Sequence, residues 1–102
     1  VSNMYLDIDQ GVVSSDSGYR VLRNATITGI WAQTSDNETW TIEIRKNGSA
    51  TVIASMSITN DRGATNNLLN VNINQDDEIQ FFANGSVGIS QPVVGIEFAW
   101  RL

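Results

Sequence analysis

Apolar and polar residues alternate in two neighbouring stretches in the middle of the chain, residues 39–45 and 51–58. A period of two puts every second side chain on the same face of an extended strand. The turn formers Lys46-Asn47-Gly48 directly follow the first stretch. The pattern therefore predicts a β-hairpin in which each strand has one face for a core. The predicted core residues are Trp40, Ile42 and Ile44 in the first strand and Val52, Ala54, Met56 and Ile58 in the second.

The hydrophobic pattern also selects the length of the hairpin loop, because residues that pair across an antiparallel ladder must share a face. A two-residue loop would set Ile42 opposite Ile53, which belongs to the outer face. A three-residue loop, Lys46-Asn47-Gly48, pairs Ile42 with Val52. It also places Gly48 at the left-handed position of a bulged type I turn. We therefore expect the three-residue loop.

Six further stretches have the composition of short strands: residues 4–8, 19–22, 25–33, 69–73, 79–83 and 94–102. In the third, Gly29 interrupts the alternation between Ile27 and Ile30. A glycine inside a strand commonly marks a bulge, and a bulge here would turn both isoleucines inward. The predicted core stripe of the last stretch is Val94, Ile96, Phe98, Trp100 and Leu102. The clusters Ser35-Asp36-Asn37 and Asn60-Asp61-Arg62-Gly63 are predicted as loops.

About eight short strands without helical periodicity indicate an all-β fold. We expect a jelly-roll-like antiparallel sandwich, in which the hairpin at residues 46–48 joins the one pair of consecutive strands that are also neighbours in a sheet. An immunoglobulin-like sandwich is the alternative. The 102 residues suffice for a single domain, residues 1–102, with its own core. Residues 1–17 are a candidate arm or linker, and the start at Val1 suggests a processed product or the C-terminal part of a longer chain.

The amino-acid composition limits which catalytic and metal-binding groups the chain can provide. It contains neither cysteine nor histidine, which removes thiolate ligands, the commonest general base and the commonest transition-metal ligand. We therefore expect no enzyme activity, no catalytic residue, no cofactor and no metal. The net charge of -5 argues against nucleic acid as a partner, because phosphate binding depends on Lys and Arg. No apolar run approaches the roughly 20 residues of a membrane span, so membrane insertion is not expected.

Two acidic clusters are candidates for cation binding, Asp7 with Asp9 and Asp76-Asp77-Glu78. A calcium site needs several oxygen ligands from convergent loops, and neither cluster has the ligand spacing of an EF-hand. A glycosidase would need two carboxylates that flank a cleft, and no spacing here indicates such a pair. We interpret both clusters as turn caps and solvated charge.

Two aromatic residues, Tyr5 and Trp31, are the candidate glycan contacts. An exposed aromatic ring offers a flat apolar face against which a sugar ring can stack. Trp40 and Trp100 share the parity of predicted core stripes, so core packing accounts for them. Tyr5 and Trp31 are less firmly tied to a core stripe and are therefore retained as candidates.

Several apolar residues have the parity of the outer face and form the candidate subunit interface: Leu22, Ile53, Leu68, Phe82 and Val93. A single exposed apolar residue needs no explanation, whereas several on one surface mark a protein contact. We expect a homo-oligomer, with a trimer preferred. The alternatives are that these residues are scattered singly, or that residues 1–11 fold back over Phe82.

Four segments, GYRVLRNATITGIWAQTS, TIEIRKNGSATVIASMSI, INQDDEIQFFANG and QPVVGIEFAWRL, together cover most of the chain. Their strand alternation and turn residues resemble a β-sandwich module of bacteriophage virion proteins, found in fibre tips, capsid decoration proteins and head spikes. The resemblance implies a compact, often trimeric sandwich at the end of a longer fibrous or capsid-anchored chain, on the virion surface and extracellular when mature. It carries over no catalytic residue, and residues before Gly18 lie outside the resembling pattern.

The leading hypothesis from the sequence is therefore a non-enzymatic structural or adhesive virion module, which decorates a capsid or forms a fibre tip. Its expected partners are other copies of itself, other virion proteins or a host-surface glycan. The alternative hypothesis is a carbohydrate-binding module of a secreted bacterial protein, which would share the sandwich and the exposed aromatic residues.

Overall fold

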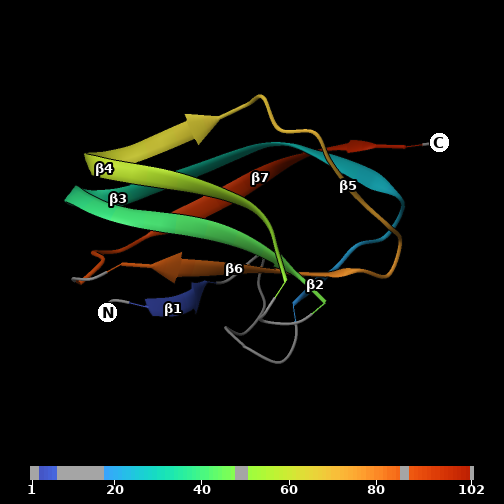
Figure 1. Cartoon of the computed structure of the whole chain (residues 1–102), viewed down its shortest axis with the longest axis horizontal. Coiled ribbons are helices and arrows are strands. Elements are labelled where there is room, and N and C mark those ends of the chain that lie inside the picture. Colours follow the sequence, from blue (N-terminus) through green and yellow to red (C-terminus); the bar gives the residue numbers. More distant parts are fainter. Residues whose placement is uncertain (1–2, 7–17, 48–50, 86–87, 102) are drawn as a thin grey trace.

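The computed structural model describes residues 3–6, 18–47, 51–85 and 88–101, with only the backbone described for residues 3–6 (Figure 1). All regular structure in this part of the chain is β-strand, and every strand pairing is antiparallel. The strands are β1 (Asn3–Leu6), β2 (Tyr19–Arg20), β3 (Ala25–Lys46), β4 (Val52–Asn66), β5 (Val71–Ile73), β6 (Glu78–Asn84) and β7 (Val93–Trp100). The predicted all-β, antiparallel class is confirmed.

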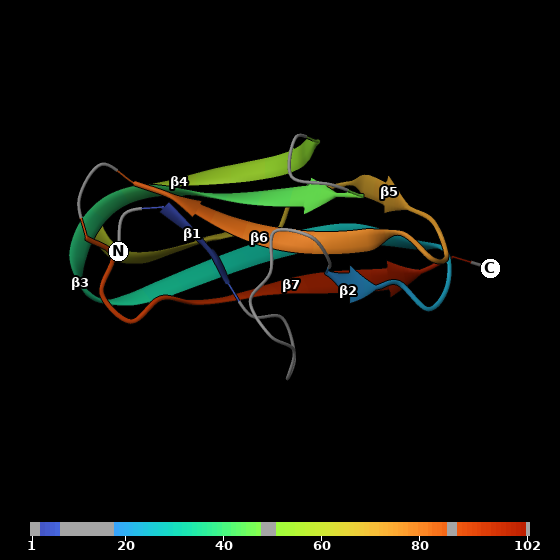
Figure 2. The ribbon, with the colours of Figure 1, turned by 90° about the horizontal axis from the view of Figure 1, so that it is seen from below.

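β3 is the central strand, and its neighbours change along its length. The first half of β3, residues 25–33, pairs with β7 on one side and with β5 and the end of β4 on the other. The second half, residues 38–46, pairs with β6 and with the start of β4. β1 and β2 both pair with the other edge of β6. Figure 2 shows the long β3–β4 hairpin curving so that the two halves of β3 lie one above the other.

The strand order is thus β7–β3–β4 in one half of the molecule and β2–β6–β3–β4 in the other. Two details differ from the expected jelly roll. Hydrogen bonds join both halves into one bent seven-stranded sheet, because β3 and β4 run through both. β1 pairs with β6, whereas the first strand of a jelly roll pairs with the last. Within the described residues, β7 therefore has a partner strand on one side only.

The two predicted loops at residues 35–37 and 60–63 are wrong, because both segments continue as strand through the bend of the hairpin. Their turn-forming residues produce irregular pairing instead of a chain reversal. The β3–β4 register shifts between Gln33 and Glu38, and Asn60 has a positive φ of 46°. The buried Thr34 hydroxyl lies 2.8 Å from the carbonyl oxygen of Asp36 and 3.1 Å from that of Arg62. These bonds fix both strands at the bend.

The hairpin register was predicted incorrectly, although the core face of the first strand was predicted correctly. Ile42 pairs with Met56 instead of Val52, a shift of four residues that preserves parity. The loop is longer than three residues, since the backbone N–H of Lys46 donates to the carbonyl of Thr51 at 2.9 Å. Asn47 takes the left-handed conformation, with φ 54°. The prediction for Gly48 lies outside the described residues.

A bulge on β4 exchanges the expected roles of Val52 and Ile53. Ile44 pairs with Ala54 but Arg45 pairs with Val52, so that Ile53 is the extra residue. Val52 is consequently exposed, while Ile53 is half-buried and packs against the core. The predicted inward Val52 and outward Ile53 are both wrong, because a bulge reverses the alternation at that point.

The predicted bulge at Gly29 is confirmed. Ile27 pairs with Phe98 and Gly29 with Glu97, so the β3–β7 register shifts by one residue between them. Both Ile27 and Ile30 are buried as a result. A Cβ on Gly29 would contact the carbonyl oxygen of Asn66 at 3.3 Å, which indicates a close approach of the two backbones.

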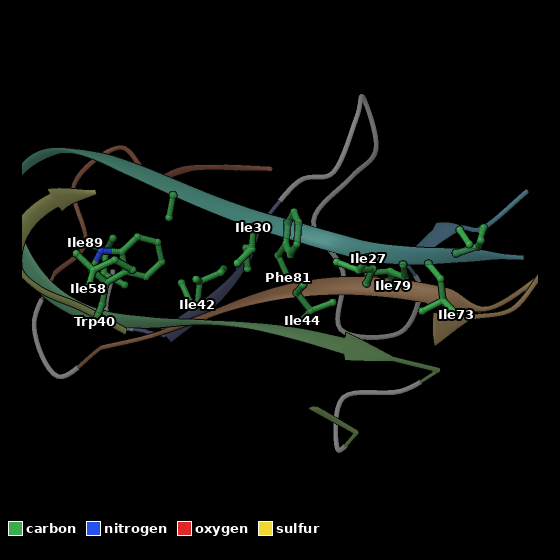
Figure 3. Close-up of a cluster of buried hydrophobic side chains, with 14 residues drawn as sticks. Ile27, Ile30, Trp40, Ile42, Ile44, Ile58, Ile73, Ile79, Phe81 and Ile89 are labelled. Atoms are coloured by element: carbon green, nitrogen blue, oxygen red, sulfur yellow. The ribbon is translucent and has the colours of Figure 1, made fainter. Parts of the chain in front are cut away.

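The core lies between the two halves of the bent hairpin, where side chains from both halves point toward one another (Figure 3). It is composed of branched aliphatic residues with two large aromatic ones. Its members are Val21, Ala25, Ile27, Ile30, Ala32, Trp40, Ile42, Ile44, Ile58, Ile73, Ile79, Phe81, Ala83 and Ile89. The predicted core residues of β3 are all among them, whereas Ala54 and Met56 of β4 are only partly buried.

The core stripe predicted for β7 is correct for its middle and wrong at its end. Val94, Ile96 and Phe98 pack against the core, but the side chain of Trp100 is 51% exposed. Trp100 pairs with Ala25, at the very start of β3. Because β7 has a described partner strand on one side only, parity alone does not bury a side chain at its end.

Replacing Trp40 should destabilise the fold strongly, because its side chain is only 2% exposed. Trp40→Ala should lower the free energy of unfolding by about 3–5 kcal/mol through the cavity that it leaves. Trp40→Phe should cost clearly less, since it fills most of the site and removes an indole N–H that has no hydrogen-bond partner in the described part of the chain. Urea unfolding measures both. A loss below about 1 kcal/mol for Trp40→Ala would contradict the core assignment.

Candidate functional site

Trp31 is an exposed aromatic residue in the centre of the sheet. It lies on the first half of β3, between Thr65 of β4 and Gly95 of β7. Its neighbours in the chain, Ile30 and Ala32, point into the core, so its own side chain lies on the outer face. The indole is 42% exposed although strands flank it on both sides. Trp31 is therefore accessible from solvent, and its role as a glycan contact stays a prediction.

Gly95 determines how the Trp31 indole lies. A Cβ at position 95 would be 2.4 Å from Nε1 and 2.5 Å from Cε2 of Trp31, closer than atoms can approach. The ring therefore covers the backbone of Gly95, which is a common way to shield a glycine within a sheet. The indole thus packs against the backbone of Gly95, while Trp31 as a whole remains 42% exposed.

A shallow depression of about 240 Å³ lies beside Trp31. Its lining combines the indole with hydroxyl, amide and carboxylate side chains. The lining residues are Gly29, Ile30, Trp31, Thr65, Asn66, Asn67, Ile96 and Glu97. The carboxylate of Glu97 is held by the hydroxyl of Thr28, which donates to Oε1 at 2.7 Å. The depression thus has an apolar wall and a polar rim.

A second aromatic group, a stacked row of three rings, was not predicted. Tyr19 of β2 stacks on Phe98 of β7 with ring centroids 6.3 Å apart, and Phe98 stacks on Trp100 at 5.8 Å. The row crosses from one half of the molecule to the other and ends in the exposed ring of Trp100. The two-residue spacing of Phe98 and Trp100 signals their shared face, but only tertiary structure brings Tyr19 to them.

The structure does not place Tyr5 beside Trp31. The backbone of Tyr5 pairs with Phe82 at the outer edge of β6, whereas Trp31 lies on the half of β3 that pairs with β7. The two predicted glycan contacts therefore belong to different halves of the sheet. Trp31 lines a depression, and the side chain of Tyr5 lies outside the described part of the structure.

The five predicted interface residues lie on different elements. Leu22 lies in the β2–β3 connection, Val93 is at the start of β7, and Leu68 is 88% exposed in the β4–β5 connection. Ile53 packs against the core. The ring of Phe82 is partly buried under the guanidinium of Arg45, whose Cζ is 3.9 Å from the ring centroid.

The cluster Asp76-Asp77-Glu78 forms the turn between β5 and β6. The Asp77 carboxylate accepts the backbone N–H of Asn74 at 2.8 Å and the side-chain amide of Asn47 at 3.0 Å. These two hydrogen bonds, assisted by the charge of Lys46, lower the pKa of Asp77 below its ordinary value of 3.8. The structure thus places Asp77 as a turn cap. The other predicted acidic pair, Asp7 and Asp9, lies outside the described residues.

Within residues 18–47, 51–85 and 88–101, no group of three or more acidic side chains is placed to hold a metal ion.

Among the described residues there is no helix with the length and hydrophobicity needed to cross a bilayer.

Comparisons with protein-family models, with curated proteins and with solved structures find no match to this chain.

Removing the Asp77 carboxylate should weaken the fold at neutral pH. Asp77→Asn should lower the free energy of unfolding by about 1–2 kcal/mol at pH 7, because two hydrogen bonds to a charged acceptor are lost or weakened. Since the folded-state pKa is lowered, the stabilisation by Asp77 is complete above about pH 4 and is lost as the pH falls through the lowered pKa. Urea titrations at pH 7 and pH 2.5 should therefore show a difference between wild type and variant that shrinks at low pH. A constant difference would contradict this role.

Proposed function

We propose that the chain is a non-enzymatic structural or adhesive module of a bacteriophage virion, in a capsid decoration protein or at a fibre tip. The resemblance of residues 18–101 to such modules supports this proposal. The all-β fold is compatible with it. The observation that carries the proposal furthest is β7, a strand with a described partner on one side only and an exposed aromatic residue at its end.

An open strand edge favours contact with another chain. The backbone groups along an unpaired edge can hydrogen-bond to an added strand, and soluble proteins usually shield such edges. On β7 the edge coincides with exposed apolar side chains at both ends, Val93 at 56% exposure and Trp100. The described part of β7 carries a single charged residue, Glu97. A contact along β7 would remove apolar surface from water, and Glu97 is the one charged side chain of the strand that it could bury.

We further propose that the module acts as a homotrimer and that β7 lies in the subunit contact. The trimer follows from the resemblance to virion modules, and the position of the contact follows from the edge of β7 that has no partner strand among the described residues. Val93 is the member of the predicted interface that lies on this strand. Leu22, Leu68, Phe82 and Ile53 lie elsewhere, and their role in assembly stays a prediction.

Light scattering tests the assembly. The wild-type chain should have the mass of a trimer, and Trp100→Lys should lower that mass by placing a charge in the contact. Trp31→Lys is the matched control, because it makes the same exchange at the other exposed tryptophan of the described chain and should leave the trimer intact. Circular dichroism should show that both variants remain folded. A monomeric wild type, or equal loss of mass in both variants, would contradict the proposed contact.

Immunogold labelling tests the location. The particles are purified from a culture whose phage or prophage genome encodes this chain. An antibody against the chain should label intact particles at the capsid or at the fibre tips, and mass spectrometry should find the chain in the same particles. Particles that contain neither label nor peptide would contradict the virion proposal.

The second candidate function is a carbohydrate-binding module of a secreted bacterial protein, which the Trp31 depression favours. The labelling experiment separates the two candidates, because such a module would be found in the culture medium or attached to an enzyme. Sugar binding by itself does not separate them, since a virion adhesin would also bind sugar.

A further inference from the structure

We propose that the depression beside Trp31 binds one neutral pyranose ring. This inference rests on the adhesive part of the proposed function. The exposed part of the indole provides an apolar surface on which the C–H face of a sugar can stack. The ring packs against the backbone of Gly95, so it is oriented before a ligand arrives, and little rotamer entropy is lost on binding.

The rim of the depression supplies groups that bind hydroxyls. Asn66 lies at the end of β4, and its Oδ1 accepts the backbone N–H of Leu68 at 3.0 Å. This hydrogen bond orients the side-chain amide group. Glu97 is held in place by the hydroxyl of Thr28 at 2.7 Å. Thr65 and Asn67 complete the polar part of the lining. Amides, hydroxyls and a carboxylate next to an aromatic wall match the alternating C–H and O–H groups of a sugar.

The charges of the site select neutral sugars. Glu97 is the only ionisable side chain of the lining, and no Lys or Arg belongs to it. The whole chain carries a net charge of -5. A sialylated, sulfated or phosphorylated sugar would therefore meet repulsion with no compensating cation. The carboxylate of Glu97, which already accepts the Thr28 hydroxyl, has further acceptor capacity for the hydroxyls of a neutral sugar.

The size of the depression indicates a single ring. Its volume of about 240 Å³ corresponds to roughly eight water molecules at ~30 Å³ each. A monosaccharide displaces a comparable amount of water, whereas a peptide segment would extend beyond the lining. We therefore expect weak, millimolar affinity for one sugar unit, which several copies in an oligomer would strengthen by avidity.

The experiment titrates the wild-type chain with the neutral methyl β-pyranosides of glucose, galactose and N-acetylglucosamine, and with sialic acid as the anionic comparison. Saturation-transfer NMR and tryptophan fluorescence report binding per subunit, independently of assembly. At least one neutral pyranoside should bind with a dissociation constant of about 1–10 mM, and sialic acid should not bind.

Three variants distinguish the proposed site from a general effect of tryptophan. Trp31→Ala should lower the affinity at least about tenfold. Gly95→Ala should have a similar effect while it retains Trp31, because the added methyl displaces the indole from its position. Trp100→Ala, at the other exposed tryptophan of the described residues, should leave sugar binding unchanged. Circular dichroism confirms that each variant is folded.

Binding of none of the three neutral sugars at about 50 mM would overturn the inference, and so would equal losses for Trp31→Ala and Trp100→Ala. Preferential binding of sialic acid would overturn the selection for neutral sugars. The virion proposal is judged separately by the labelling of particles. Labelled particles without sugar binding would refute this site alone, whereas sugar binding without labelled particles would refute the virion location and favour the secreted module.

Discussion

The pairing of both halves of β3 is the constraint on which the rest of the fold depends. This strand has neighbours on both sides along most of its length, and four other strands pair with it directly. Its alternation supplies core residues to both halves of the molecule, from Ile27 in the first to Ile44 in the second. Because hydrogen bonds run through the bend, the two halves cannot move independently. The positions of Trp31 and of the β7 edge both follow from this strand.

Two polar clusters position the ends of the central hairpin. At the bend, the buried hydroxyl of Thr34 contacts backbone carbonyls from both strands. At the other end, Asn47 donates to Asp77 and accepts the backbone N–H of Glu78 at 2.8 Å. The hairpin loop is therefore attached to the β5–β6 turn, and this attachment involves the residue that the sequence pattern assigned to a tight turn. At Asn47, tertiary contacts therefore override the local preference for a tight turn.

The sequence predicted those features that depend on side-chain parity. The all-β class, the inward face of β3 and the bulge at Gly29 all follow from a period of two and its interruption. Register and strand length were missed because they depend on contacts between segments distant in the chain. Val52 and Ile53 exchange faces through a bulge that no glycine marks, and residues 35–37 continue a strand although their composition favours a loop. Trp31 was a candidate because the pattern did not tie it firmly to a core stripe. Its packing against Gly95, and the stacking of Phe98 on Trp100, can be seen only in the folded structure.

The pairing of β7 with β3 has a consequence for the order in which the protein is made and folds. The first half of β3 is synthesised early, and its partner β7 is synthesised last among the described strands. Until β7 has been synthesised, Ile27 and Ile30 are less buried than in the folded protein. The edge of residues 25–33 that pairs with β7 is then still without that partner. Contacts between such distant segments are slow to form, since a long loop must close first. The nascent chain is therefore exposed to aggregation at its own central strand, a stage at which a chaperone would have most effect.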